Sequence, residues 1–236
     1  MIRVIKIIFI VLAITVFLGT LMGAHASMGE ELPQLNPTLD NFTKQNTYTS
    51  GLFSDVDSSA WYAPNVATAY ELGLIKGISN STFGVLGNIT IAEAIALAAR
   101  IDSIFYTGEA NFVQGNVWYQ CYVDYALDVG IIAGTYPNYN ATATRAQFAT
   151  ILSSALPSYA LEEMNWVEDN VIPDVKLTDS YGEAVYKLYR AGILTGSDAE
   201  GTFNPQNPIS RTEVAAIVTR MADVSLRQPI TLVGEY

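Results

Sequence analysis

The sequence predicts a mainly α-helical protein built from a structural unit that occurs three times. The first observation is a five-residue turn in which two glycines enclose two apolar residues and one further residue, found at 73–77, 130–134 and 192–196. The second is a Thr or Ser ten to fourteen residues after each turn, with Glu or Gln three places further on. Because each copy must bury its apolar face against the other copies, this repeat defines the architecture of the chain.

A first helix is expected before each turn. Apolar residues stand three, four and seven places before the first glycine, which is the spacing of one helical face. That glycine lies where a helix end commonly needs a left-handed residue. The apolar positions are Tyr70, Ala69 and Val66, then Leu127, Ala126 and Val123, then Tyr189, Leu188 and Val185.

A second helix is expected to begin at Thr90, Thr144 and Ser210, where the hydroxyl and the Glu or Gln can form a capping box. The residues four, seven, eight and eleven places after each cap are all apolar. We therefore expect the three second helices to form a central bundle, with the first helices and loops as three peripheral lobes. Coiled-coil assembly is a weaker alternative, because these helices are too short for sustained heptads.

The chain begins with a predicted signal peptide at 1–26. Arg3 and Lys6 precede an apolar run from 7 to 23, and Ala24-His25-Ala26 is typical of a cleavage site. An uncleaved membrane anchor is the alternative, because the apolar run is long for a signal peptide. The rest divides into a linker at 27–52, repeats at 53–102, 110–156 and 171–222, an acidic insertion at 157–170 and a tail at 223–236.

Composition excludes several classes of protein. The only histidine, His25, lies in the predicted signal peptide, so we expect no Ser-His-Asp or Cys-His catalysis, no metal site and no cofactor. The single cysteine, Cys121, has no partner for an internal disulfide. The net charge is −11, and without residues 1–26 ten Lys and Arg face 23 Asp and Glu, giving −13. Such a chain is poorly suited to binding nucleic acid.

Several motifs of the repeats together resemble those of S-layer homology (SLH) modules, which usually occur as three in tandem. They are Phe53-Ser54-Asp55-Val56, Trp61, the glycine turn, Gly201-Thr202-Phe203-Asn204-Pro205 and Thr144-Arg145-Ala146-Gln147. The resemblance covers nearly all of 53–222, and the third repeat is the closest match. It implies a pseudo-threefold unit that holds a secreted protein non-covalently to the cell wall of a Gram-positive bacterium. The implied ligand is a secondary cell-wall polysaccharide, often with a pyruvate ketal on an amino sugar, bound in grooves between repeats.

Arg145 and Arg211 are the first candidate ligand-binding residues. Each follows a cap residue and so lies in the first turn of a helix, where a cation is mildly unfavourable. An anion bound jointly by the N-terminal N–H groups and the guanidinium would explain this placement. The alternative is a solvated surface charge.

Two further pairs complete the candidate site. Trp61 and Trp118 each stand twelve residues before a turn glycine, where they could stack on a sugar or fill the core of a lobe. Asp55 and Asp174 could accept hydrogen bonds from sugar hydroxyls or cap the turn that opens their repeat.

The three copies differ at these positions. Repeat one has Ile91 where the others have Arg, repeat two lacks the Asp at 112–115, and repeat three lacks the Trp at 178–181. No single repeat therefore carries all three residue types. Because the family's grooves are shared between repeats, we expect one or two competent grooves.

The predicted function is wall anchoring without enzymatic activity. The repeats leave only the linker and the tail, so we expect the chain to anchor a surface protein partner, decorate the wall alone or form one subunit of an assembly. The main alternative is a module that binds another protein at the cell surface. A third hypothesis is a two-carboxylate glycoside hydrolase, although no pair of acids forms a motif outside the repeat framework.

Overall fold

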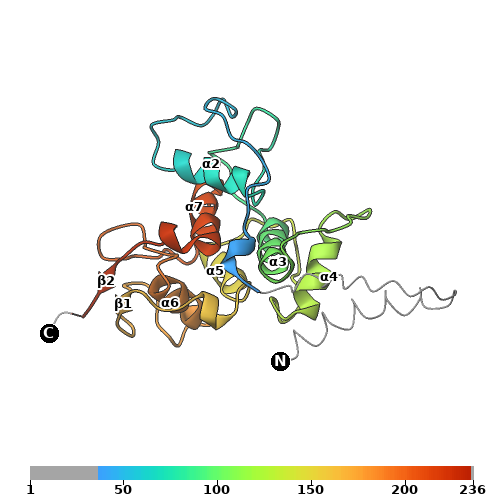
Figure 1. Cartoon of the computed structure of the whole chain (residues 1–236). Helices are drawn as coiled ribbons and strands as arrows, with labels where there is room; N and C mark the ends of the chain where they lie inside the picture. The colour runs from blue at the N-terminus through green and yellow to red at the C-terminus, as the bar shows by residue number, and fades with distance from the viewer. Residues whose placement is uncertain (1–36, 235–236) are drawn as a thin grey trace, which may run out of the picture. The chain divides into compact units, whose positions relative to one another are not determined.

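The structure is a computed structural model that describes residues 37–234 and is mainly helical, as predicted (Figure 1). The predicted signal peptide lies outside the described residues. The α-helices are α2 (Ala63–Glu71), α3 (Ile91–Thr107), α4 (Gln120–Asp128), α5 (Arg145–Leu152), α6 (Gly182–Arg190) and α7 (Arg211–Ala222). Shorter elements are η2 (Leu39–Asn41), η3 (Ser158–Ala160), η4 (Val224–Leu226) and the strands β1 (Trp166–Val167) and β2 (Thr231–Leu232). Within 37–234, no helix is both long enough and apolar enough to cross a membrane.

The predicted helix boundaries are confirmed by the caps. Helices α3, α5 and α7 each begin with a complete capping box, at Thr90, Thr144 and Ser210. The first helices α2, α4 and α6 end just before glycines in the left-handed region, with φ of 67° at Gly73, 77° at Gly130 and 72° at Gly192. These local signals fix where the helices of each repeat begin or end.

The predicted apolar stripe of the second helices forms the core. All twelve positions are buried: Ala94, Leu97, Ala98, Ile101, Phe148, Ile151, Leu152, Ala155, Val214, Ile217, Val218 and Met221. The stripe of the first helices is buried except at Tyr70, which is half-buried, and Leu127, which is exposed. The prediction is wrong at Leu127, whose side chain is 37% exposed.

Each first helix packs against the second helix of a different repeat. Helix α2 contacts α7, α4 contacts α3, and α6 contacts α5 (Figure 1). Helix α3 also contacts α5. Each peripheral helix is therefore held by a repeat other than its own, so no repeat is a closed unit.

A ring of backbone hydrogen bonds joins the residues that precede the three caps. Ile89 N donates to Ile209 O (3.3 Å), Ile209 N donates to Ala143 O (3.2 Å), and Ala143 N donates to Ile89 O (2.9 Å). The ring ties together the starts of the three second helices.

Segments outside the repeats pack against them. The described part of 27–52, predicted to be a linker, is docked: Thr38 N donates to Phe105 O (3.2 Å) and Gln45 N to Glu71 O (2.6 Å). The acidic insertion and the tail pair through the parallel strands β1 and β2. Arg227 of the tail is buried, with Nη2 donating to Ala160 O (2.7 Å). Apolar periodicity could not predict this docking, because it rests on hydrogen bonds of the backbone and of the Arg227 side chain.

Candidate functional site

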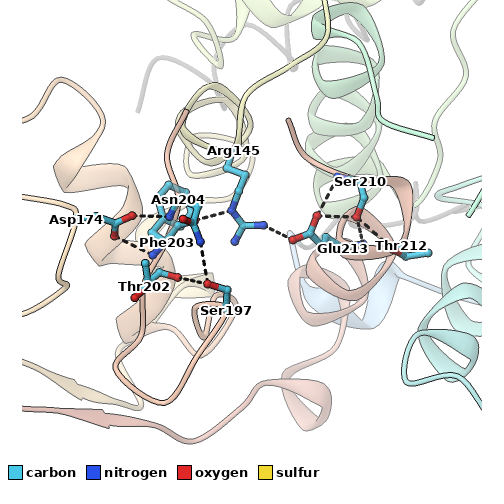
Figure 2. A network of polar contacts seen from close by, with 9 residues as sticks. All are labelled: Arg145, Asp174, Ser197, Thr202, Phe203, Asn204, Ser210, Thr212 and Glu213. Carbon is cyan, nitrogen blue, oxygen red and sulfur yellow. Dashed lines mark hydrogen bonds and ion pairs between the residues drawn. The ribbon is translucent and has the colours of Figure 1, made fainter. Parts of the chain in front are cut away.

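Arg145 lies at the start of α5 and is buried within a polar network (Figure 2). Its Nε donates to Phe203 O (2.6 Å) and its Nη1 pairs with Glu213. The guanidinium lies over the Phe203 ring, with Cζ 5.1 Å from the ring centroid. The Glu213 carboxylate, from a different repeat, is a local reason for a cation at this helix start.

Arg211 has the same environment at the start of α7. Its Nε donates to Phe83 O (3.0 Å), its Nη1 lies 3.6 Å from Glu93 Oε1, and Cζ lies 5.1 Å from the Phe83 ring centroid. Its Nη2 donates to Lys76 O (2.7 Å). Burial lowers the pKa of this guanidinium, while the carboxylates of Glu93 and Asp55 raise it. Both arginines are buried, so the alternative hypothesis of a solvated surface charge is wrong for each of them.

Asp174 binds the backbone of a distant loop. Its Oδ1 accepts from Phe203 N (2.9 Å) and its Oδ2 from Asn204 N (2.6 Å), as Figure 2 shows. The same Phe203 offers its carbonyl to Arg145. Asp174 therefore positions the arginine through this loop.

Asp55 does the same in repeat one. Its Oδ1 accepts from Phe83 N (2.7 Å), and its Oδ2 accepts from Gly84 N (2.7 Å) and Val85 N (3.1 Å). Burial raises the pKa of Asp55, but the hydrogen bonds from Phe83, Val85 and Gly84 outweigh it and leave the pKa below its usual value. The two aspartates do not cap the turns that open their repeats, because converging N–H groups of the later loop hold them. In both aspartates, each carboxylate oxygen already accepts a hydrogen bond from a backbone N–H group, and the expected contact with sugar hydroxyls stays a prediction.

Trp118 lies on the wall of a groove of about 310 Å³, which we call the Trp118 groove. Its side chain is 40% exposed, so it is not lobe core. Trp118 comes from repeat two, Arg211 from repeat three, and Glu93 and the glycine turn from repeat one. The lining residues are Gly73, Leu74, Ile75, Lys76, Gly77, Ile78, Ile89, Glu93, Ala96, Leu97, Arg100, Gln114, Trp118, Tyr122, Arg211 and Val214.

Trp61 lies on the wall of a second groove of about 320 Å³, the Trp61 groove. Its side chain is 62% exposed. Here the tryptophan comes from repeat one, Arg145 from repeat two, and Glu213 and the glycine turn from repeat three. The lining residues are Trp61, Arg145, Leu194, Thr195, Gly196, Ser197, Glu213, Ala216, Ile217 and Arg220.

A second arginine lines each groove and was missed by the sequence analysis. Arg100 lines the Trp118 groove and its Nη2 donates to Gly73 O. Arg220 lines the Trp61 groove and its Nη1 donates to Ile193 O (3.0 Å). Both stand ten residues after their caps, where repeat two has Ser154. Aligning the repeats by their caps would have revealed this pair.

Ser154 lines a third depression of about 590 Å³, which we call the serine hollow. Ser180 also lines it, and Ser180 stands twelve residues before Gly192, where the other repeats have tryptophan. The hollow is lined by three acids and two bases, with Ser153, Ser158, Leu161 and Ala184 completing its walls. The charged residues are Glu162, Glu163, Glu183, Lys187 and Arg190.

The two grooves share one kind of chemistry. Each offers an indole, two guanidinium groups and a carboxylate already paired with one of them. Within residues 37–234, no cluster of His, Cys, Asp or Glu is arranged to hold a metal ion. The arrangement suits a ligand with an anionic group and a face that can stack on an aromatic ring.

Fold and grooves together define a helical repeat protein that assembles its sites from several repeats. The family model of the S-layer homology domain matches residues 52–95 and 171–215. These two segments therefore match the S-layer homology domain, as the motifs predicted. That residues 110–156 form a third module stays a prediction.

The chain is similar to parts of much longer surface proteins and enzymes. It is 25% identical to a surface-layer 125 kDa protein of Lysinibacillus sphaericus over 85% of this chain and 19% of the relative. It is 25% identical to the exoglucanase XynX of Acetivibrio thermocellus over 73% of this chain and 16% of the relative. It is 30% identical to a cell surface protein of Thermoanaerobacter kivui over 44% of this chain and 12% of the relative. The chain thus spans less than a fifth of the length of these curated relatives.

Proposed function

We propose that this protein binds an anionic cell-wall polysaccharide and is thereby held non-covalently at the bacterial cell surface. Relatives described as a surface-layer protein, a cell surface protein and an exoglucanase differ in their stated roles but share this region. A common anchoring role for the region explains why proteins with such different stated roles share it. The organism is proposed to be Gram-positive, with the wall polymer as the partner.

The matched pair of grooves carries the proposal. The same set of a tryptophan, two arginines, a glutamate and a glycine turn occurs twice, assembled each time from three different repeats. The indole would stack on a sugar ring, and the guanidinium groups would bind the carboxylate of a pyruvate ketal through charge-assisted hydrogen bonds. We assign the direct contacts to Trp61, Trp118 and the arginines, and a positioning role to Asp55 and Asp174.

We further propose a pseudo-threefold organisation with two competent grooves and a central bundle of α3, α5 and α7. The hydrogen-bonded ring of Ile89, Ala143 and Ile209 supports it, as does the exchange of first helices between repeats. At the place where a third groove would lie, which we call the third position, Ile91 stands in place of the first arginine. Ser154 and Ser180, which line the serine hollow, stand in place of the second arginine and the tryptophan. We propose that this position does not bind the polymer.

The charges inside the groove explain how an acidic chain can bind an anionic polymer. The net charge is −11, yet the Trp118 groove is lined by Lys76, Arg100 and Arg211 against Glu93 alone. Repulsion by distant carboxylates is screened beyond about 8 Å at physiological salt, so groups inside the groove decide binding. We propose no catalytic role for Glu93 or Glu213, since each is engaged by its capping box and an arginine.

The test uses the exposed tryptophans, which can be removed with little effect on packing. Co-sedimentation with purified cell wall should fall strongly for a Trp61→Ala/Trp118→Ala variant. Trp166→Ala is the matched control, because Trp166 is 68% exposed and lines neither groove. Chemical removal of pyruvate from the wall should abolish retention of the wild-type protein. Full retention on depyruvylated wall would instead indicate a protein or uncharged ligand and refute the proposal.

A further inference from the structure

The Trp118 groove adjoins a second, polar cavity of about 640 Å³. Both are lined by Gly73, Lys76 and Arg100, so the second cavity begins where the groove ends. Its other walls come from segment 41–46, which precedes repeat one, and from the loop at 108–111. We call it the amide cavity, after the side chains of Gln45, Asn46 and Asn111 that line it.

In these three side chains of the amide cavity, the hydrogen-bond donors are engaged but the acceptors are not. The amide nitrogens bond within the protein: Asn46 Nδ2 donates to Tyr70 O (2.8 Å), Gln45 Nε2 to Thr43 Oγ1 (3.0 Å), and Asn111 Nδ2 to Glu109. Within residues 37–234, no hydrogen bond engages the amide oxygens of these three side chains. The cavity therefore offers acceptors to a ligand that donates.

Arg100 adds a positive charge at the junction of the two cavities. Its Nη2 is bonded to Gly73 O, but its Nε is buried and has no hydrogen-bond partner among the described residues. That Nε is closed to solvent, so a ligand in the cavity cannot reach it, and Arg100 contributes its positive charge. Arg100 lines both cavities and can therefore take part in binding a ligand that spans them.

We propose that the amide cavity is a subsite for a neutral sugar unit next to the pyruvylated unit held in the Trp118 groove. Hydroxyl groups would donate to the amide oxygens. The half-buried ring of Phe42 supplies an apolar surface, and the unengaged amide oxygens, as acceptors, favour a neutral donor over a second anion. This inference rests on the proposed function and extends it to a second unit of the polymer.

The Trp61 groove provides an internal control. All its lining residues belong to the repeats or their turns, whereas segment 41–46 lies outside them. A longer ligand should therefore gain affinity in the Trp118 groove and not in the Trp61 groove.

The probes are the pyruvylated monosaccharide and the pyruvylated disaccharide released from the wall polymer by partial depolymerisation. Titration calorimetry on Trp61→Ala reports the Trp118 groove, and on Trp118→Ala the Trp61 groove. We expect the disaccharide to bind about tenfold more tightly than the monosaccharide to Trp61→Ala, and equally to Trp118→Ala.

A Gln45→Ala/Asn111→Ala pair in the Trp61→Ala background should remove the gain and leave monosaccharide affinity unchanged. Both side chains are exposed, so these changes should preserve the fold. Equal affinity of the two probes for Trp61→Ala would overturn the subsite while leaving the proposed function intact. Binding of neither probe to either variant would overturn both.

Discussion

The Trp118 groove and the serine hollow share three matching positions of the repeats but carry opposite charge. Arg100, Trp118 and Tyr122 of the groove correspond to Ser154, Ser180 and Ala184 of the hollow. Three cations face one glutamate in the groove, whereas three glutamates face two cations in the hollow. The backbone ring and the capping boxes are nevertheless complete in all three copies. Different residues therefore form the fold and line the grooves. One copy of the repeat can lose its groove residues and still keep its fold.

The two grooves also differ from each other. Lys76 belongs to the Trp118 groove, while the matching position in the third repeat is Thr195. The Trp61 groove therefore has two cations, Arg145 and Arg220, against Glu213. If anion binding is the function, the Trp118 groove should be the stronger of the two.

The largest expected effect is that of removing the buried arginines. Arg145→Ala and Arg211→Ala each delete a bond to a phenylalanine carbonyl and leave a glutamate without its cation. Each should lower the free energy of unfolding by about 2–3 kcal/mol and abolish most binding in its groove. Denaturant unfolding and wall co-sedimentation measure the two effects.

Arg→Lys at the same positions separates charge from geometry. Lysine keeps the charge but cannot reproduce the fork of donors, so partial binding is expected. Unchanged wall binding by the Arg145→Ala/Arg211→Ala double variant would contradict the site assignment.

The next largest effect is expected at Asp55, which holds the loop whose Phe83 carbonyl binds Arg211. Asp55→Asn weakens three hydrogen bonds from backbone N–H groups and should cost about 2 kcal/mol. Because the folded-state pKa of Asp55 is lowered, its contribution is present at neutral pH and is lost as pH falls below about 3.9. Thermal unfolding at several pH values should show the wild type and Asp55→Asn converging below that pH. A constant difference from pH 7 to pH 3 would refute this account.

A moderate effect is expected for the second arginines. Arg100→Gln and Arg220→Gln should each weaken binding in one groove about tenfold, which corresponds to about 1.4 kcal/mol. Ser154→Gln is the matched control in the third copy and should leave binding unchanged. Titration with the pyruvylated monosaccharide measures all three variants.

A smaller effect should distinguish the two grooves by their salt dependence. Raising the ionic strength from about 0.05 to about 0.5 M should weaken the Trp118 groove more than the Trp61 groove, by a few-fold, because its surplus of cations is larger. Trp61→Ala and Trp118→Ala isolate the grooves for this comparison. Equal salt dependence would mean that Lys76 takes no part.

The smallest effect is expected at the third position. Ile91→Arg should not change wall retention, because the serine hollow has neither the second arginine nor the tryptophan. A clear gain in co-sedimentation would show that Ile91 alone silences this position.

Local sequence signals predicted the helices well, because capping and apolar spacing act within a few residues. Thr90 and Glu93, for example, form their capping box within one turn. The partners of the aspartates and arginines could not be predicted in this way. Asp55 binds Phe83 N across 28 residues, and Arg211 binds Phe83 O across 128.

Each first helix packs against the second helix of a different repeat, and this packing determines which side chains line the same groove. Trp118 and Arg211 line the same groove only because repeats two and three both pack against repeat one there. The docking of residues 41–46 was equally hidden, since that segment has no apolar periodicity. Arg100 and Arg220 could be predicted from the cap alignment, since both stand ten residues after their caps, but the prediction of binding residues considered only the arginines next to the caps.

Binding stoichiometry tests the central claim most directly. Titration calorimetry of the wild-type protein with the pyruvylated monosaccharide should give two sites per chain, and Trp61→Ala and Trp118→Ala should each give one. Three sites in the wild type, or a tryptophan variant that retains both, would contradict the account.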